Sequence, residues 1–296
     1  MAQATLTTKS KPRQFFEKLC KKLRFKKPML TFPHLLISLV FVFVPLGFML
    51  VHAFMRQDTV TREFYFTIAN FASFFTAAVL LQLWRSIVVA FLTTVFCLIL
   101  AYPLALALAN SKINKSVILV LMFVLPMYMH SLLRAQAMRV VLDIMGMTQL
   151  NQALFSIVIS NVYIFFPFML LPIYTSLANM DKSYLEASRD LGAGSLSTFG
   201  RIVLPLSLPG IISGIFMVFM PVLSSFAVRD IVMLGIVGEG WRLFGNELFG
   251  IIRGTRHDGE AAAYAFILLA VVFAIMIGAY YIQSWREKRS GVSAYD

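Results

Sequence analysis

Long stretches without a charged residue dominate this sequence and restrict what it can fold into. Each is close to the roughly 20 residues that an α-helix needs to cross the hydrocarbon core of a membrane. The mean hydropathy is +0.80 and only 14% of the residues are charged, so the chain is more apolar than a globular protein with a wetted surface. Strand-like alternation is absent, which argues against a β-barrel. The stretches are 31–53, 64–84, 86–109, 116–133, 153–180, 202–228 and 261–285. They predict an all-α polytopic membrane protein.

Seven stretches do not make seven spans, because a helix cannot reverse direction across Arg85 alone, which separates the second stretch from the third. The second stretch contains several Thr, Ser, Asn and Gln residues. We therefore expect 64–84 to form an interfacial helix on the extracytoplasmic side, which leads into the next span. Six transmembrane helices remain. Their predicted bounds are about 31–53, 85–109, 116–135, 153–178, 203–226 and 261–284.

The distribution of Lys and Arg predicts the orientation, since these residues stay on the cytoplasmic side near the ends of spans. Nine of them lie in the first 27 residues. The other clusters consist of Lys112, Lys115, Lys182, Arg189, Arg201, Arg286, Lys288 and Arg289. With six spans, all of these clusters fall on one face, which then holds 17 of the 26 cations. Both termini are therefore expected to be cytoplasmic.

The two ends of the chain are predicted to be tails outside the membrane. The basic tail at 1–30 contains a segment, 14–27, that can form an amphipathic helix on anionic lipid or act only as a positive signal that orients the first span. A short C-terminal tail follows at 286–296. The net charge of +12 comes mostly from the N-terminal tail, so a folded nucleic-acid-binding domain is not indicated.

A polar loop at 179–203 separates the fourth predicted span from the fifth. Asp181 is suited to cap the start of a helix, Gly192 to end it in a left-handed conformation, and Ser195 to begin another. The expected result is a short amphipathic helix, a turn, and a second helix that re-enters the membrane near Pro205. An apolar helix face in a cytoplasmic loop needs a protein partner.

The residues of this loop carry a resemblance to a family. Glu186-Ala187-Ser188, Gly192 and Ile202-Val203-Leu204-Pro205 have the spacing of the E-A-A coupling motif in the membrane subunits of bacterial ABC importers, with Ser188 in place of an alanine. Looser matches at 66–71, 133–134 and 146–151 resemble the spermidine/putrescine permease group. Related permeases for iron, thiamine or sulfate share some of these outer patterns.

The resemblance implies a type I importer permease in the bacterial inner membrane. Its expected partners are a second, similar permease, two ATPase subunits and an extracytoplasmic substrate-binding protein. ATP and Mg²⁺ would belong to the ATPases, because no G-x-x-x-x-G-K-[ST] phosphate-binding loop occurs in this chain, which is thus not expected to be an enzyme. The residues implied to couple to the ATPase are Glu186, Ala187, Ser188, Gly192, Ile202, Leu204 and Pro205. We expect Glu186 to meet a cation or backbone donors, and Leu185 and Leu191 to fill a groove.

A polyamine is an extended polycation, so its path should offer carboxylates and aromatic faces. The candidates are Asp230, Asp143, Tyr163, Phe166 and Glu239. The region after Pro221 reads as a broken helix with a re-entrant segment that lines the path, or as an ordinary extracytoplasmic hairpin. Nine arginines on the same side favour an anionic substrate such as sulfate instead: Arg56, Arg62, Arg85, Arg134, Arg139, Arg229, Arg242, Arg253 and Arg256.

Two other classes of function are less well supported by the sequence. A secondary transporter or channel would favour an internal repeat and acidic residues within the spans, and neither is found. An intramembrane enzyme would need clustered catalytic groups, yet the four histidines are scattered, and no metal-binding H-E-x-x-H or Ser/His arrangement is visible. Cys20 and Cys97 are far apart and predict no disulfide.

Overall fold

The computed structural model describes residues 27–57, 63–110, 116–147, 149, 152–234, 241–254 and 258–290. The chain divides into two units, 1–52 and 53–296. The described part of the first unit is helix α2 (Lys27–Ala53), whose last residue belongs to the second unit. The predicted basic tail lies almost entirely outside the described residues.

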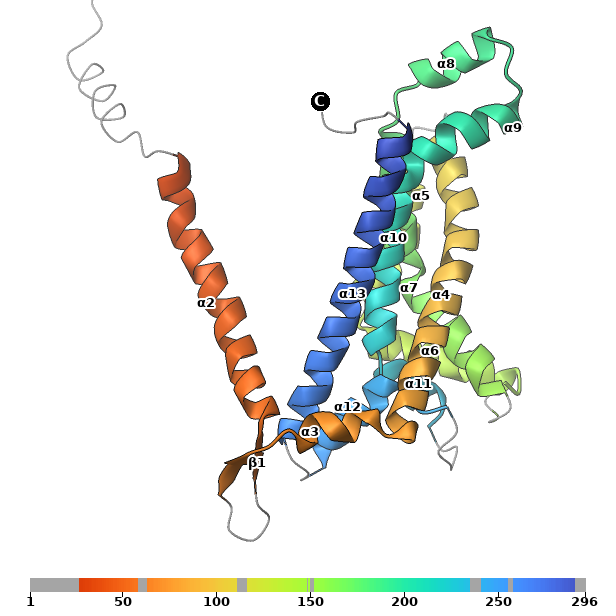
Figure 1. Ribbon diagram of the computed structural model, residues 1–296. Helices are drawn as coiled ribbons and strands as arrows, with labels where there is room; N and C mark the ends of the chain where they lie inside the picture. The colour runs from red at the N-terminus through yellow and green to blue at the C-terminus, as the bar shows by residue number, and fades with distance from the viewer. Residues whose placement is uncertain are drawn as a thin grey trace, which may run out of the picture. The chain divides into compact units, whose positions relative to one another are not determined.

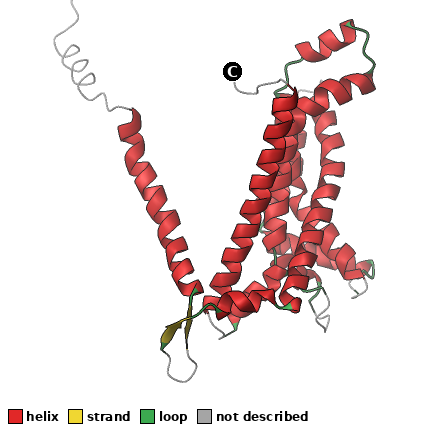
Figure 2. Cartoon of the chain, viewed as in Figure 1, coloured by secondary structure: helices red, strands yellow, loops and turns green. Residues whose placement is uncertain are grey.

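Three long helices pack side by side at the centre of the second unit, namely α4 (Ala77–Asn110), α7 (Ala153–Ala178) and α10 (Leu204–Ser224) (Figure 1). A fourth, α13 (Asp258–Ser290), runs in a similar direction and packs against α3 (Ala69–Ala72) and α12 (Phe244–Arg253). Figure 2 shows that the described chain is helical except for its loops and one small hairpin. In this hairpin β1 (Met55–Gln57) pairs antiparallel with β2 (Phe64–Phe66).

Short elements occupy both ends of this bundle. At one end lie α8 (Ser183–Asp190) and α9 (Ser195–Thr198), and at the other lie α3, α6 (Ser131–Ile144), α11 (Ala227–Val232) and α12 (Figure 1). We call these the α8 end and the α12 end. Helices that cross from one end to the other therefore place the two polar regions of the sequence on opposite sides of an apolar layer.

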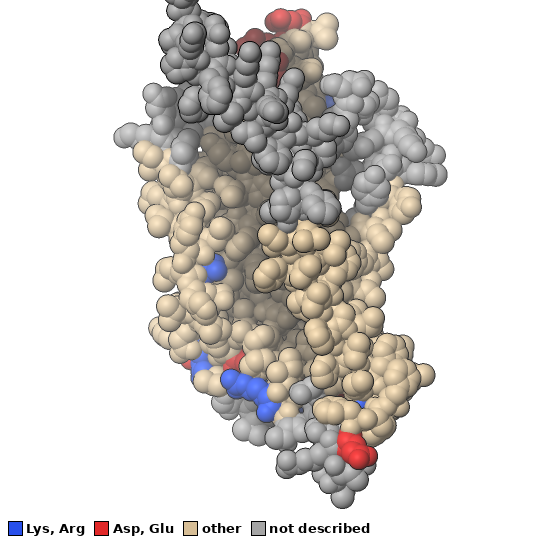
Figure 3. Space-filling model, turned by 90° about the vertical axis from the view of Figure 1, so that its left-hand side faces the viewer, with Lys and Arg blue, Asp and Glu red and all other residues tan. Residues whose placement is uncertain are grey.

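The span count agrees with the predicted six-helix membrane fold. Among the described residues, five helices are long and apolar enough to cross a membrane, and a sixth span arises if α5 (Ser116–Val124) and α6 are counted as one bent pair. On the face drawn in Figure 3, charged side chains lie mostly near the lower and upper edges, and the broad band between them is uncharged except for one blue patch. This distribution is expected of a protein whose middle contacts hydrocarbon.

The predicted boundary of the second span at Arg85 is wrong. The helix α4 begins at Ala77 and carries Arg85 within it, so the segment before this helix is shorter than 64–84 and consists of β2, α3 and the 3₁₀ turn η1 (Ser73–Phe75). The break falls at Thr76, whose backbone is extended. Arg85 is accepted inside the helix because its guanidinium lies 5.5 Å from the ring centre of Trp241.

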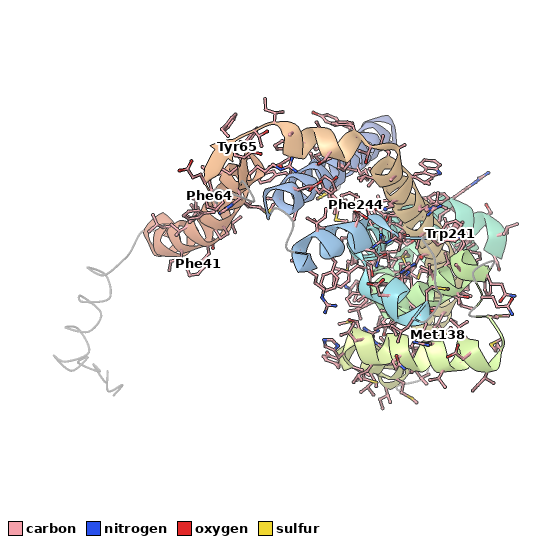
Figure 4. The ribbon with its side chains drawn as sticks, turned by 90° about the horizontal axis from the view of Figure 1, so that it is seen from below. Phe41, Phe64, Tyr65, Met138, Trp241 and Phe244 are labelled. Atoms are coloured by element: carbon pink, nitrogen blue, oxygen red, sulfur yellow. The ribbon has the colours of Figure 1, made fainter. Side chains whose placement is uncertain are left out.

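The third predicted span, 116–135, is not one helix. A 3₁₀ turn at Leu125–Tyr128, which contains Pro126, follows α5, and Met129 is extended. His130 then caps the next helix, as its Nδ1 accepts a hydrogen bond of 3.3 Å from the backbone N–H of Leu132. The two helices meet at 96°, so α6 lies across the end of the bundle (Figure 4). The proline and the cap together redirect the chain.

Small side chains allow the central helices to approach closely. Every fourth residue along α4 is fully buried, and the last three of this series are small: Val89, Thr93, Cys97, Ala101 and Ala105. Helix α10 contributes Gly210 and Gly214 to its contact with α7, where an added Cβ would lie 2.6 Å from the carbonyl oxygen of Pro172 and 2.7 Å from Sδ of Met169. Close packing of this kind drives helix association in lipid, where burial of apolar surface offers no gain.

Candidate functional site

The predicted helix at the start of the polar loop is present as α8. A carboxylate oxygen of Asp181 accepts a hydrogen bond of 2.9 Å from the backbone N–H of Ser183. This bond lowers the pKa of Asp181, so the carboxylate that supports the first turn stays charged to a lower pH than an ordinary aspartate. The structure places Asp181 one residue before the helix cap, which is Lys182.

Gly192 ends α8 in the predicted manner. Its φ is +74°, in the left-handed region, and its N–H donates to the carbonyl of Arg189 at 2.9 Å. The N–H of Ala193 donates to the carbonyl of Ser188 at 3.0 Å, which completes a Schellman motif. A Cβ on Gly192 would meet no atom within 4 Å, so the requirement for glycine here comes from backbone conformation.

The two sides of α8 differ in composition. Ser188 is buried and Leu185 is half-buried against the bundle core. Since residues advance by about 100° each around a helix, the side turned away from the bundle centres on Glu186, Ala187 and Asp190, which are exposed. Tyr184 and Leu191, with 55% and 87% of their surface exposed, lie along one edge of that side.

We call Tyr184, Glu186, Ala187, Asp190 and Leu191 the outer face of α8. The hypothesis that Leu185 and Leu191 together fill a partner's groove is therefore only half compatible with the structure. Leu185 points toward this chain's own core because it lies next to Ser188 on the inner side, and only Leu191 is available to a partner.

Ser188, the one departure from the alanine-containing pattern, connects the two short helices. Its hydroxyl lies 2.8 Å from that of Thr198 in α9, and the two share a hydrogen bond. Only 5% of the Ser188 surface is exposed. The bond closes the turn that contains Gly192 and Gly194.

The loop then passes without a break into the bundle. A π-helical turn, Phe199–Val203, joins α9 to α10, and residues 195–224 form one continuous helical segment. Ile202 lies in this turn, and Leu204 and Pro205 are the first two residues of α10. Pro205 has no N–H to donate to the preceding turn, and the π-helical turn lies directly before it in this segment.

Tyr102 of α4 fixes this junction. Its ring packs edge-on against Phe199, with ring centres 5.8 Å apart, and its hydroxyl shares a hydrogen bond of 3.0 Å with Ser207. The residues implied to couple to an ATPase thus lie on one connected path from α8 to α10 and α4.

The α12 end holds a cluster of polar groups around Asn246. This side chain is buried, and its amide nitrogen donates to Asp230 at 2.7 Å and to the carbonyl of Phe226 at 3.0 Å. Its oxygen accepts from the backbone N–H of Leu243 at 3.1 Å. Asp230 also pairs with its neighbour Arg229 at 3.2 Å. Asn246 therefore fastens α11 to α12.

A second set of contacts joins this cluster to α4. The backbone N–H of Phe244 donates to Ser86 at 2.8 Å, and Gln82 donates to Glu247 at 3.1 Å. Figure 4 looks onto this end and labels Phe244 and Trp241, which follow one another closely at the start of α12. Trp241 has a φ of +57°, a strained value for a bulky residue. The α12 end is thus a rigid polar cap.

The break predicted after Pro221 is present but lies further along. Helix α10 continues through Pro221 to Ser224, and the extended residue Ser225 separates it from α11. Gly245 packs directly over this break, since a Cβ there would lie 2.6 Å from the carbonyl oxygen of Ser224. The chain is therefore a broken helix at this point.

The candidates for the substrate path are not gathered into one site in this chain. Asp143 pairs with Arg139 at 3.5 Å in α6, Phe166 packs near Phe123 with ring centres 6.3 Å apart, and Tyr163 is 43% exposed on α7. Asp230 belongs to the α12-end cluster. Glu239 lies outside the described residues.

Sequence reasoning missed the role of Arg134. Only 4% of its surface is exposed, and its guanidinium donates to the carbonyl of Ile164 at 2.7 Å, which joins α6 to α7. Its Nε has no hydrogen-bond partner among the described residues. The sequence did contain a signal for this role. A cation among apolar residues has a high free-energy cost unless other groups of the protein bind it.

The comparisons with known proteins give the family. No protein-family model matches the chain. The spermidine/putrescine transport system permease protein PotB of Escherichia coli is 32% identical over 267 residues, which cover 84% of this chain and 93% of that protein. The chain belongs to the spermidine/putrescine permease family. PotB of Haemophilus influenzae is 31% identical, with 81% of this chain and 88% of that protein covered.

A solved structure supports the permease fold. A bacterial ABC transporter involved in the import of the acidic polysaccharide alginate matches with a TM-score of 0.68 and covers 91% of this chain and 98% of its own. At 15% identity this likeness shows the fold alone. Both the predicted family and the predicted ABC importer permease fold are confirmed.

Proposed function

We propose that this chain is a membrane-spanning subunit of an ATP-driven importer of polyamines in the bacterial cytoplasmic membrane. The observation that carries the proposal is the 32% identity to a spermidine/putrescine permease over most of both chains. The α8 loop adds support, because it has an exposed helix face and a continuous helical connection into the bundle.

In this proposal the α8 end is cytoplasmic, and the outer face of α8 docks on an ATPase subunit. Glu186 and Asp190 supply negative charge, while Tyr184 and Leu191 supply apolar surface along one edge. The partner surface should therefore be cationic with an apolar groove beside it. When the ATPases close on ATP, α8 moves with them and α10 follows, which switches the access of the pathway.

The rest of the assembly is proposed from the family. A second permease completes the pathway, two ATPase subunits bind ATP and Mg²⁺, and an extracytoplasmic protein delivers the substrate to the α12 end. This chain contributes the pathway and the coupling, and no chemical step of ATP hydrolysis.

The excess of arginines does not by itself favour an anionic substrate such as sulfate. Six of the arginines have partners among the described residues. Arg139, Arg229 and Arg242 pair with Asp143, Asp230 and Glu247. Arg85 and Arg253 lie against aromatic rings, and Arg134 donates to a backbone carbonyl. These contacts account for six of the nine arginines within the fold, so their number does not require an anionic substrate, and the polyamine proposal rests on the family.

The proposal is tested by transport in proteoliposomes that contain the complex purified through a tag on this chain. We expect uptake of labelled spermidine only with ATP on the ATPase side, competition by putrescine, and no competition by sulfate. A proton ionophore should not reduce the uptake. ATP-independent uptake that the ionophore abolishes would instead support a secondary transporter. ATP-driven uptake of sulfate would show that the substrate is an anion and not a polyamine.

Asp230 is the acidic group best placed to meet an ammonium group, since its side chain is 42% exposed at the α12 end. Asp230→Asn keeps an oxygen for the bond from Asn246 but removes the charge. We expect the KM for spermidine to rise about tenfold with little change in maximal rate, as for the loss of one exposed charged contact. Glu260→Gln, which neutralises an acidic group at the start of α13 that was not among the predicted path residues, is the control. Equal KM values for the two variants and the wild type would remove Asp230 from the path.

A further inference from the structure

The turn between α8 and α9 is built so that it could act as a hinge. It contains Gly192 and Gly194, and a Cβ at either glycine would meet no atom within 4 Å. Nothing packs against these two positions. Backbone bonds from Gly192 and Ala193 end α8, but they lie on the α8 side of the turn and do not reach α9.

The side-chain bond between Ser188 and Thr198 spans this turn. It joins residues ten positions apart, one in each helix, with 2.8 Å between the hydroxyl oxygens. Ser188 is 5% exposed, so water has little access to compete for its hydroxyl. An alanine at position 188 would fill almost the same space and make no such bond. The bond therefore restrains the angle between α8 and α9.

Downstream of Thr198 the chain is stiff. The helical segment continues to Ser224, and Tyr102 holds the junction through Phe199 and Ser207. A displacement of α9 is thus passed on to α10 and, through Tyr102, to α4. Gly200 on this path is also unpacked, but it lies inside the continuous helical segment, whereas Gly192 and Gly194 lie in the turn between the two helices.

We propose that Ser188 and Thr198 are positioning residues that lock α8 to α9, so that the loop transmits the movement of the ATPase as one rigid body. The inference rests on the proposed ATP-driven import. It assigns to Ser188 the tightness of coupling, which is the number of ATP molecules hydrolysed for each polyamine imported.

The first test measures this ratio in proteoliposomes for Ser188→Ala, Thr198→Val and the double variant. Each single variant should raise the ATP hydrolysed per spermidine imported by about two- to tenfold, the range set by the loss of one buried hydrogen bond. The double variant should show no further increase, because both changes remove the same bond. Ser197→Ala, next to Thr198, is the control and should leave the ratio unchanged. Unchanged ratios in the single variants, or additive effects, would overturn the lock.

A second test distinguishes a lock from a hinge. The hydroxyl oxygens of Ser188 and Thr198 lie 2.8 Å apart, so we expect an added oxidant to join the two thiols of Ser188→Cys/Thr198→Cys in a reducible disulfide. Each single cysteine variant serves as a control. A rigid loop predicts full transport in the cross-linked protein. Arrest on oxidation with recovery on reduction would show that the turn must bend, and failure to cross-link would contradict the contact itself.

Different results would contradict the proposed function and the proposed lock. If the wild-type complex imports no spermidine with ATP, the proposed function is wrong. If the wild type imports spermidine normally and the Ser188→Ala ratio is unchanged, only the lock is wrong.

Discussion

Gly210→Ala is expected to destabilise the protein by about 1–3 kcal/mol, the usual cost of overpacking a tight core. The added Cβ would lie 2.6 Å from both the carbonyl oxygen of Pro172 and the Cβ of Ser176. Neither atom can move without shifting α7, because one is backbone and the other is fixed to it. The measurement is thermal unfolding of the purified protein in detergent, supported by the yield of folded protein.

Two other glycines give graded controls for this prediction. At Gly214 the nearest atom to an added Cβ is Sδ of Met169 at 2.7 Å, and a flexible thioether can rotate away, so Gly214→Ala should cost less. At Gly278 in α13 a Cβ would meet nothing within 4 Å, and Gly278→Ala should be neutral or slightly stabilising. Equal effects at all three positions would show that α7 and α10 do not pack in this way.

The sequence alone predicted the features that depend on residues within a single helix. Helix α7 has the predicted bounds, 153–178, because a long apolar run is ended by a polar loop and needs no tertiary information. The end of α8 at Gly192 was also predictable, since the left-handed residue after a helix is a local requirement. The six-span fold followed from the same local signals.

The sequence was not sufficient where contacts between residues far apart in the chain determine the structure. Arg85 was taken as a boundary, but Trp241, more than 150 positions away, accepts its charge within α4. The Gly210-x-x-x-Gly214 pattern was present in the sequence, yet only α7 shows why both glycines are needed. Ser188 looked like a minor departure from a motif until Thr198 supplied its partner.

The second large effect is expected for Glu186→Arg. Polyamine uptake should fall at least about tenfold, and the ATPase subunits should no longer copurify with this chain, because a reversed charge would face the proposed cationic partner surface. Glu186 is exposed on the outer face of α8, so the substitution leaves the packing of this chain unchanged. Copurification on a tag attached to this chain measures the loss directly.

The expected loss of docking in Glu186→Arg has to be separated from the effect of this substitution on the stability of α8. Glu186 lies in the first turn of α8, where an acidic residue stabilises the helix by roughly 0.3–1 kcal/mol through the helix dipole. Glu186→Ala loses this stabilisation without adding repulsion, so it should reduce uptake less than Glu186→Arg does. Arg201→Glu reverses a charge at the same end of the bundle, at an exposed position in the π-helical turn that is not part of the outer face of α8. Because the outer face of α8 carries the docking in this proposal, Arg201→Glu should keep the ATPase bound. Loss of the ATPase in Arg201→Glu as well would mean that net charge at this end, and not Glu186, governs assembly.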